Sequence, residues 1–101
     1  MNPMQQMMMQ AQKMQRDLAK AHAQINEKEF TVSKGGAVTV TMLGNRELKE
    51  IKIDEDAFDV ENKEMVEEMI VMAINELVQT IDKEHADANE KITGRRDGLG
   101  I

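Results

Sequence analysis

A chain of 101 residues can build one modest hydrophobic core, and the absence of cysteine excludes disulfides, thiol chemistry and cysteine-based zinc sites. Trp and Tyr are absent, which argues against aromatic platforms for single-stranded nucleic acid. The formal net charge of −6 also disfavours nucleic acid as a partner, but the charge is unevenly spread. Residues 1–28 carry four basic and two acidic residues, whereas residues 61–92 carry three basic and nine acidic residues.

The first predicted element is an amphipathic helix over residues 4–26. Asn2 can cap it, and Pro3 fits its first turn, where a backbone N–H would have no partner. Apolar residues recur at alternating spacings of three and four, as in a helix that packs against another helix. These seam positions are Met4, Met7, Ala11, Met14, Leu18, Ala21 and Ile25. The opposite face carries glutamines and cations, and no acidic residue precedes Asp17.

A three-stranded antiparallel meander is predicted next, because apolar and polar residues alternate in three short runs. The runs are residues 29–33, 37–42 and 47–53. The glycines at 35 and 36 supply the positive φ that a tight reversal needs. Ile51 and Ile53 are expected to face inward, and Leu48, which is out of phase, indicates a β-bulge or a slightly later start of the strand. An alternative is that the edge strand of the meander pairs with another subunit.

A long second helix is predicted to start near residue 59 or residue 62 and to run to about residue 92, with Thr93–Gly94 as its stop signal. Its first half is apolar over a wide arc, which fits a segment that lies on a sheet and also meets another element. Its last turns keep only a thin apolar stripe. The stripe consists of Ile81, His85, Ala88 and Ile92.

No metal site is expected. The acidic connector at residues 54–59 lacks the glycine and the terminal glutamate of a calcium-binding loop. His22 and His85 have no partners at ligand spacing along the chain. Nothing resembles an active site, so the chain is interpreted as a non-enzyme without cofactor or small-molecule substrate. No secretory signal or membrane span is visible, which favours a cytoplasmic protein.

The helices are longer than the strands, so both must overhang the sheet. The overhanging segments, residues 4–14 and 81–92, are predicted to lie antiparallel and to cover each other's apolar stripes. The predicted fold is α+β, with one α-β-β-β-α domain over residues 1–94 and a projecting two-helix arm. Residues 95–101 are predicted to be a short flexible basic tail.

Three segments together resemble the YbaB/EbfC family of bacterial nucleoid-associated proteins. They read MQQMMMQAQKMQRDL, GGAVTVTMLGNRELKEIKID and EMVEEMIVMAINEL. The resemblance spans roughly residues 4–77 and rests on a combination of features, including Gly35–Gly36 before an alternating strand and Gly44 at the next turn. It implies a homodimer joined through its central body, with tweezer-like arms that grip duplex DNA at low sequence specificity. It also implies a place in the nucleoid and an influence on nucleoid organisation and gene expression.

By position, the resemblance implies DNA contacts from both helices of the arm. The side chains concerned are Gln5, Gln12, Lys13, Gln15, Arg16, Lys20, Lys83 and Lys91. Such residues, together with helix N-termini, are the usual ligands of phosphate. The end of the second helix also carries acids that would repel phosphate, namely Asp82, Glu84, Asp87 and Glu90. A different function therefore stays open, in which the Met-rich arms grip a protein partner and bind no DNA.

Overall fold

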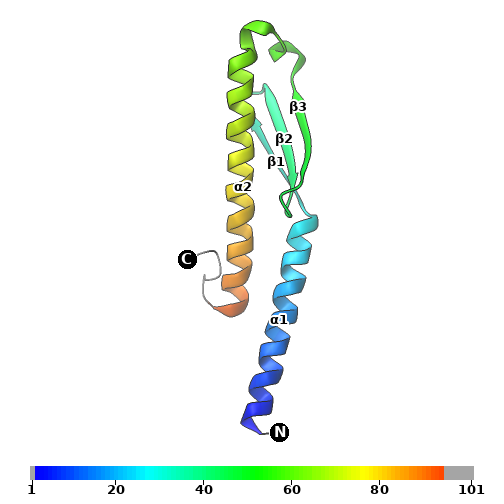
Figure 1. Ribbon diagram of the computed structural model, residues 1–101, viewed down its shortest axis with the longest axis vertical. Coiled ribbons are helices and arrows are strands. Elements are labelled where there is room, and N and C mark those ends of the chain that lie inside the picture. Colours follow the sequence, from blue (N-terminus) through cyan, green and yellow to red (C-terminus); the bar gives the residue numbers. More distant parts are fainter. Residues whose placement is uncertain (1, 95–101) are drawn as a thin grey trace.

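The computed structural model describes residues 2–94, in the order helix, three strands, helix (Figure 1). Helix α1 (Pro3–Glu27) leads into strand β1 (Glu29–Lys34). The remaining elements are β2 (Val38–Leu43), β3 (Leu48–Ile53), the short 3-10 helices η1 (Glu55–Ala57) and η2 (Val60–Asn62), and helix α2 (Lys63–Thr93). The molecule is elongated, with extents of 71 × 24 × 15 Å. The predicted α-β-β-β-α order is confirmed; the predicted basic tail, residues 95–101, lies outside the described residues.

Helix α1 begins as the sequence predicts. The Asn2 side chain accepts a hydrogen bond from the backbone N–H of Gln5 (2.8 Å), and the Gln5 side chain accepts one from the backbone N–H of Asn2 (3.4 Å). This reciprocal capping satisfies donors that a helix start otherwise leaves unpaired. The helix ends at Glu27, and only Lys28 separates it from β1. Helix α1 therefore extends from the end of the sheet and does not cross its face (Figure 1).

The sheet is antiparallel, with β2 between β1 and β3. Val40 on β2 lies opposite Ile51 on β3. Further along β2, Thr41 lies opposite Glu50, but Met42 lies opposite Leu48, so β3 contributes one extra residue at this point. This irregularity is a bulge, one of the two explanations predicted for the phase of Leu48. It places Leu48 on the same face as Met42, because directly opposed residues of neighbouring strands share a face.

Helix α2 packs across β1 and β2 and leaves β3 to one side (Figure 1). The largest fully buried side chains come from the central strand and from α2. They are Val38, Val40, Leu77 and Ile81. Ile51 lies on the same face of the sheet as Val40, as predicted. The expectation that Ile51 is buried is wrong, because α2 does not cover β3 and leaves Ile51 exposed.

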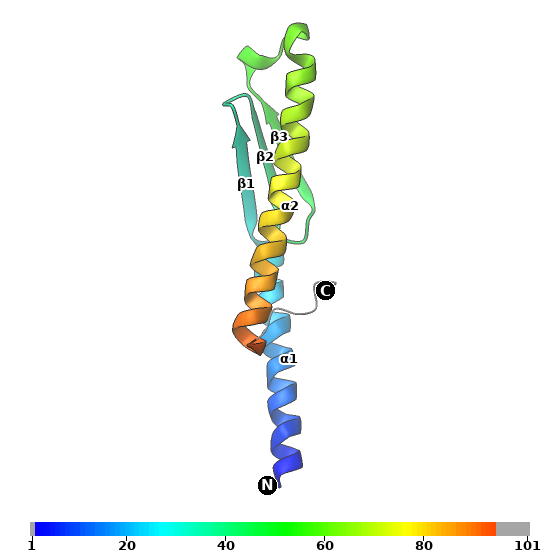
Figure 2. The same cartoon turned by 90° about the vertical axis from the view of Figure 1, so that its left-hand side faces the viewer.

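The two helices form the predicted arm, but the predicted register between them is wrong. His22 contacts His85 and Asn89, and Ile92 reaches only the level of Met14. Helix α2 thus covers the second half of α1, and residues 3–13 project beyond it (Figure 2). The register prediction assumed that α1 crosses the sheet. Helix α1 instead ends where the sheet begins, so only its second half runs alongside α2. Its first three turns therefore project without a helix packed along them among residues 2–94.

Candidate nucleic-acid interface

The predicted DNA-contact side chains of α1 are all exposed to solvent. They are Gln5, Gln12, Lys13, Gln15, Arg16 and Lys20. With about 100° of rotation per residue, Arg16 and Lys20 fall on the side of α1 opposite the apolar seam. Gln15 lies closer to the seam than to these cations by the same rotation. The structure therefore supports one continuous polar face on α1, with Gln15 at its margin.

Ion pairs divide the candidate cations into two groups. The Lys13 ammonium lies 3.1 Å from the Asp17 carboxylate, and that of Lys83 lies 2.8 Å from Asp87. Both pairs have the i, i+4 spacing of neighbours on a helix surface. Arg16, Lys20 and Lys91 form no ion pair with any residue between 2 and 94, and all three are exposed.

The cations of α2 do not all join the polar face of α1. Lys91 lines a groove between the two helices, together with Asp17 and Gln24 of α1. Lys83 falls on the side of α2 opposite Ile81, which is in the buried core, so it points away from α1. The structure thus places Lys91 beside Asp17 and Gln24 of α1 and leaves Lys83 apart.

The acidic end of α2 is partly neutralised by basic residues. The Lys28 ammonium lies 2.6 Å from the Glu84 carboxylate, and Arg46 pairs with Asp82. Both basic partners lie where the arm meets the sheet. These exposed pairs add little stability, but they reduce the repulsion that the acidic residues would exert on phosphate.

The exposed face of the sheet is a poorer phosphate site than α1. Glu29 accepts a hydrogen bond from Lys49 across the sheet and raises the pKa of Lys49 above its usual value. The Lys52 ammonium lies 3.8 Å from the Glu50 carboxylate. Each cation of this face therefore already has a carboxylate partner.

Gly44 holds the arm to the sheet. Its backbone N–H donates to the carbonyl of Lys28 (2.9 Å), and its carbonyl oxygen accepts a hydrogen bond from Nε2 of His85 (3.0 Å). The turn lies so close to α1 that a Cβ atom at this position would be 1.7 Å from the carbonyl oxygen of Ile25. A glycine here is required by space, since the φ angle of Gly44 is not in the left-handed region.

Two histidines, treated as isolated in the sequence, meet beside Gly44. The Nδ1 atoms of His22 and His85 are 2.6 Å apart, so one donates a hydrogen that the other accepts. The Asn89 side-chain oxygen lies 2.6 Å from Nε2 of His22, which extends the network along α2. The expectation that each histidine is alone is wrong. The available signal was that His85 occupies the α2 stripe and that His22 borders the α1 seam.

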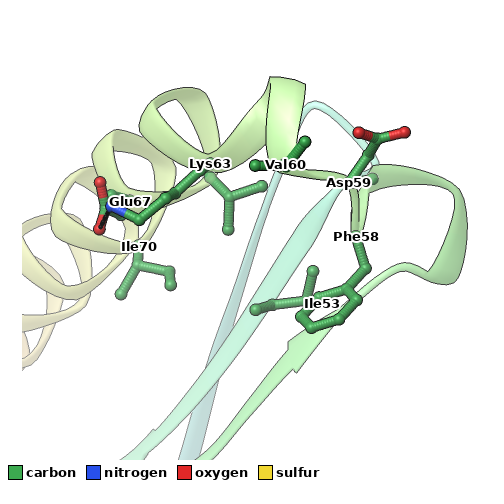
Figure 3. Close-up of a pocket in the computed structure, with 9 residues that line it drawn as sticks. Ile53, Phe58, Asp59, Val60, Lys63, Glu67 and Ile70 are labelled. Carbon is green, nitrogen blue, oxygen red and sulfur yellow. Dashed lines mark hydrogen bonds and ion pairs between the residues drawn. The ribbon is translucent and has the colours of Figure 1, made fainter.

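An apolar groove lies at the opposite end of the molecule from the arm. Its volume is about 380 Å³, and its lining side chains come from the end of β3, the connection after it and the first turns of α2 (Figure 3). Two of them, Phe58 and Val60, are 80% and 84% exposed. The carboxylates of the connector form no cluster suited to a metal within residues 2–94. Over the same residues, no helix is long and apolar enough to span a membrane.

Comparisons with known proteins agree with the resemblance. The profile of the YbaB/EbfC DNA-binding family matches residues 1–96. A nucleoid-associated protein of Clostridium novyi is 42% identical over 89 residues, which are 87% of this chain and 78% of that protein. One of Enterococcus faecalis is 42% identical over 85 residues, 83% of this chain and 82% of that protein. The crystal structure of an uncharacterized protein from Helicobacter pylori is similar with a TM-score of 0.73 at 21% identity, covering 93% of this chain and 99% of that one, which supports the fold alone.

Proposed function

The chain belongs to the YbaB/EbfC DNA-binding family, and on this premise we propose that it binds duplex DNA as a homodimer with low sequence specificity. We place it in the bacterial nucleoid, where such binding influences nucleoid organisation and gene expression. The observation that carries the proposal is the exposed face of α1, where Arg16 and Lys20 have no acidic partner within residues 2–94.

The polar face of α1, together with the start of the helix, suits contacts with a phosphate backbone. It offers cations, glutamines and a helix N-terminus, which are common donors to phosphate oxygens. No acidic residue precedes Asp17, so the first four turns carry no side chain that repels DNA. Contacts of this kind read the backbone and not the base edges, which accounts for low sequence specificity. We expect binding of roughly micromolar strength or weaker at physiological salt.

The apolar groove supports the dimer. Soluble monomers rarely expose contiguous apolar surface without a partner for it. Here the groove continues into the uncovered apolar face of β3, where Leu48 and Ile51 are also exposed. A second copy of the chain would cover this surface and leave both arms free, because the arm lies at the other end of the molecule (Figure 1).

Replacing Arg16 and Lys20 with glutamine is expected to weaken DNA binding and its salt dependence. For every phosphate that the protein no longer neutralises, the slope of log K against log salt becomes shallower by about 0.9. A mobility-shift titration of a random-sequence duplex at two salt concentrations measures both quantities.

The matched control for this change is the pair of substitutions Lys49→Gln and Lys52→Gln on the outer face of the sheet. This control removes the same amount of positive charge, but from lysines that already have carboxylate partners. The affinity for DNA should therefore change less than with Arg16→Gln and Lys20→Gln. If the control weakens binding as much as Arg16→Gln with Lys20→Gln, only total charge matters and the α1 interface is wrong.

Replacing Val60 with aspartate is expected to convert the dimer into a monomer. The substitution puts a charge into a surface that the second copy desolvates, which association does not tolerate unless the charge is paired. Light scattering at tens of micromolar distinguishes the two states. Met9→Asp, an exposed site on the arm, is the control and should stay dimeric. A wild-type monomer at this concentration would contradict the proposed assembly.

A further inference from the structure

Two histidines meet where the arm joins the sheet, and each contacts the other through the same ring atom. Nδ1 of His22 lies 2.6 Å from Nδ1 of His85. The rings are stacked, with 18° between their planes and 4.8 Å between their centroids. His85 is 7% exposed and His22 is half-buried. The contact is therefore largely withdrawn from water, and one hydrogen must lie between the two nitrogens.

The acceptors around the pair decide which ring donates this hydrogen. Nε2 of His85 lies 3.0 Å from the carbonyl oxygen of Gly44, which can only accept, so Nε2 carries a hydrogen. In a neutral His85 this leaves a lone pair on Nδ1, and the shared hydrogen belongs to His22. The amide of Asn89, 2.6 Å from Nε2 of His22, can turn to donate or to accept. The network is thus complete whether His22 is neutral or charged, provided that His85 is neutral.

A proton added to His85 has only Nδ1 left to bind. The new Nδ1–H would face the Nδ1–H of His22 across 2.6 Å, as two donors without an acceptor. Two positive rings would also be stacked, and like charges repel more strongly where water is excluded. We propose that His22 and His85 form a proton-sensitive latch. The latch holds α1 against α2 while one hydrogen lies between the rings, and it opens the arm when both rings are protonated.

The charges around the latch do not neutralise a second proton. Within residues 2–94, the ring nitrogens contact each other, Asn89 and Gly44, and no carboxylate. The charged side chains that flank the latch come from α1, from α2 and from the turn after β2. They are Asp17, Lys28, Asp82, Glu84, Lys91 and Arg46. Three of these are acidic and three are basic, so together they add no net charge.

A metal ion between the rings fits the geometry less well than a hydrogen does. Two nitrogen ligands of a tetrahedral zinc ion, each about 2.0–2.1 Å from the metal, lie about 3.3 Å apart. The observed 2.6 Å is too short for this arrangement. Residues 2–94 also contain no group of three His, Cys, Asp or Glu side chains that could hold a metal.

Opening the latch would release the half of α1 that carries the proposed DNA-binding cations. Arg16 and Lys20 belong to residues 14–27, which run alongside α2. Their position relative to the sheet therefore depends on the contact between the histidines. The latch itself does not rest on the proposed function, because it is defined by contacts within the arm and is tested without DNA.

The test measures hydrogen exchange of the backbone amides of residues 14–27 and 81–93 in the full-length protein, between about pH 7.5 and about pH 5.5. Each rate is divided by that of an unstructured peptide at the same pH, which gives the equilibrium constant for opening. In acid the open arm binds one more proton than the closed arm. The constant should therefore rise by up to about tenfold per pH unit below about pH 6.5. A constant that stays level or falls in acid would overturn the proposal.

His22→Asn is the matched variant. Its amide occupies the place of Nδ1 and can donate to a neutral His85 or accept from a charged one. The variant leaves one histidine in the chain, and its opening constant should change by less than about twofold over the same range. Ala23→Asn, at the exposed neighbouring position, should keep the pH dependence of the wild type. If His22→Asn keeps that dependence or Ala23→Asn loses it, another group senses the proton and the latch is wrong.

A second measurement needs no variant and decides the question even where His22→Asn fails to close the arm. In wild-type protein with 15N-labelled histidine, a scalar coupling across the hydrogen bond should join the two Nδ1 nuclei at neutral pH. It should vanish as the arm opens in acid. No coupling at neutral pH would show that the rings share no hydrogen, and a coupling that persists when both rings are protonated would show that the latch stays closed. Either result rejects the proposal.

Discussion

Replacing Gly44 with alanine is expected to lower the free energy of unfolding by roughly 3 kcal/mol or more. The new Cβ would lie 1.7 Å from the carbonyl oxygen of Ile25 and 2.5 Å from its carbonyl carbon. Both are backbone atoms of α1, so no side chain can rotate away. The turn must lift from the helix, which lengthens the hydrogen bond that Gly44 donates to Lys28 and the one that it accepts from His85.

Urea unfolding followed by circular dichroism measures this loss. Gly36→Ala is the matched control, because Gly36 has a φ of +67° but no atom within 4 Å of an added Cβ. Its cost should be limited to the strain of a left-handed alanine, about 1–2 kcal/mol. If both variants lose the same stability, the close approach of the turn to α1 is not what requires glycine at position 44.

Replacing His85 with leucine is expected to cost about 2–4 kcal/mol of unfolding free energy. His85 is 7% exposed and connects Nδ1 of His22 with the carbonyl oxygen of Gly44. Leucine fills a similar volume but makes neither bond, so two polar groups lose their partners where water has poor access. Hydrogen exchange should rise first in residues 14–27 and 81–93, because these segments form the arm.

A double-mutant cycle shows whether the two histidines act together. His22→Leu alone also leaves an unpaired nitrogen on its neighbour, whereas the double variant removes both nitrogens. The cost of the double variant should therefore be smaller than the sum of the single costs, by about 0.5–3 kcal/mol. Lys83→Ala, on the exposed side of the same helix, should cost less than about 0.5 kcal/mol. Strict additivity of the two histidine substitutions would show that the rings do not share a hydrogen bond.

Local signals predicted most of the fold. The start of α1 was predicted from Asn2 and Pro3, and the structure forms this cap and adds the reciprocal bond of Gln5. The phase of Leu48 predicted either a bulge in β3 or a later start of the strand, because the side-chain period of a strand has no tolerance for one extra residue. The register between β2 and β3 shows the bulge. The polar face of α1 needed only helical periodicity. The i, i+4 spacing of Lys13 and Asp17 also favours the ion pair that the structure shows.

The sequence by itself determined the elements, the order in which they follow and the charge of each helix face, because these depend on contacts within a few residues. Only the tertiary structure decided where α1 stands relative to α2. That register depends on α1 leaving the end of the sheet, and it places His22 against His85 and leaves Met4 and Met7 uncovered. The need for glycine at position 44 has the same origin, since the atom it avoids belongs to Ile25, in another element. Contacts between residues distant in sequence depend on how the packed elements are oriented relative to one another. The periodicity of the sequence does not specify that orientation.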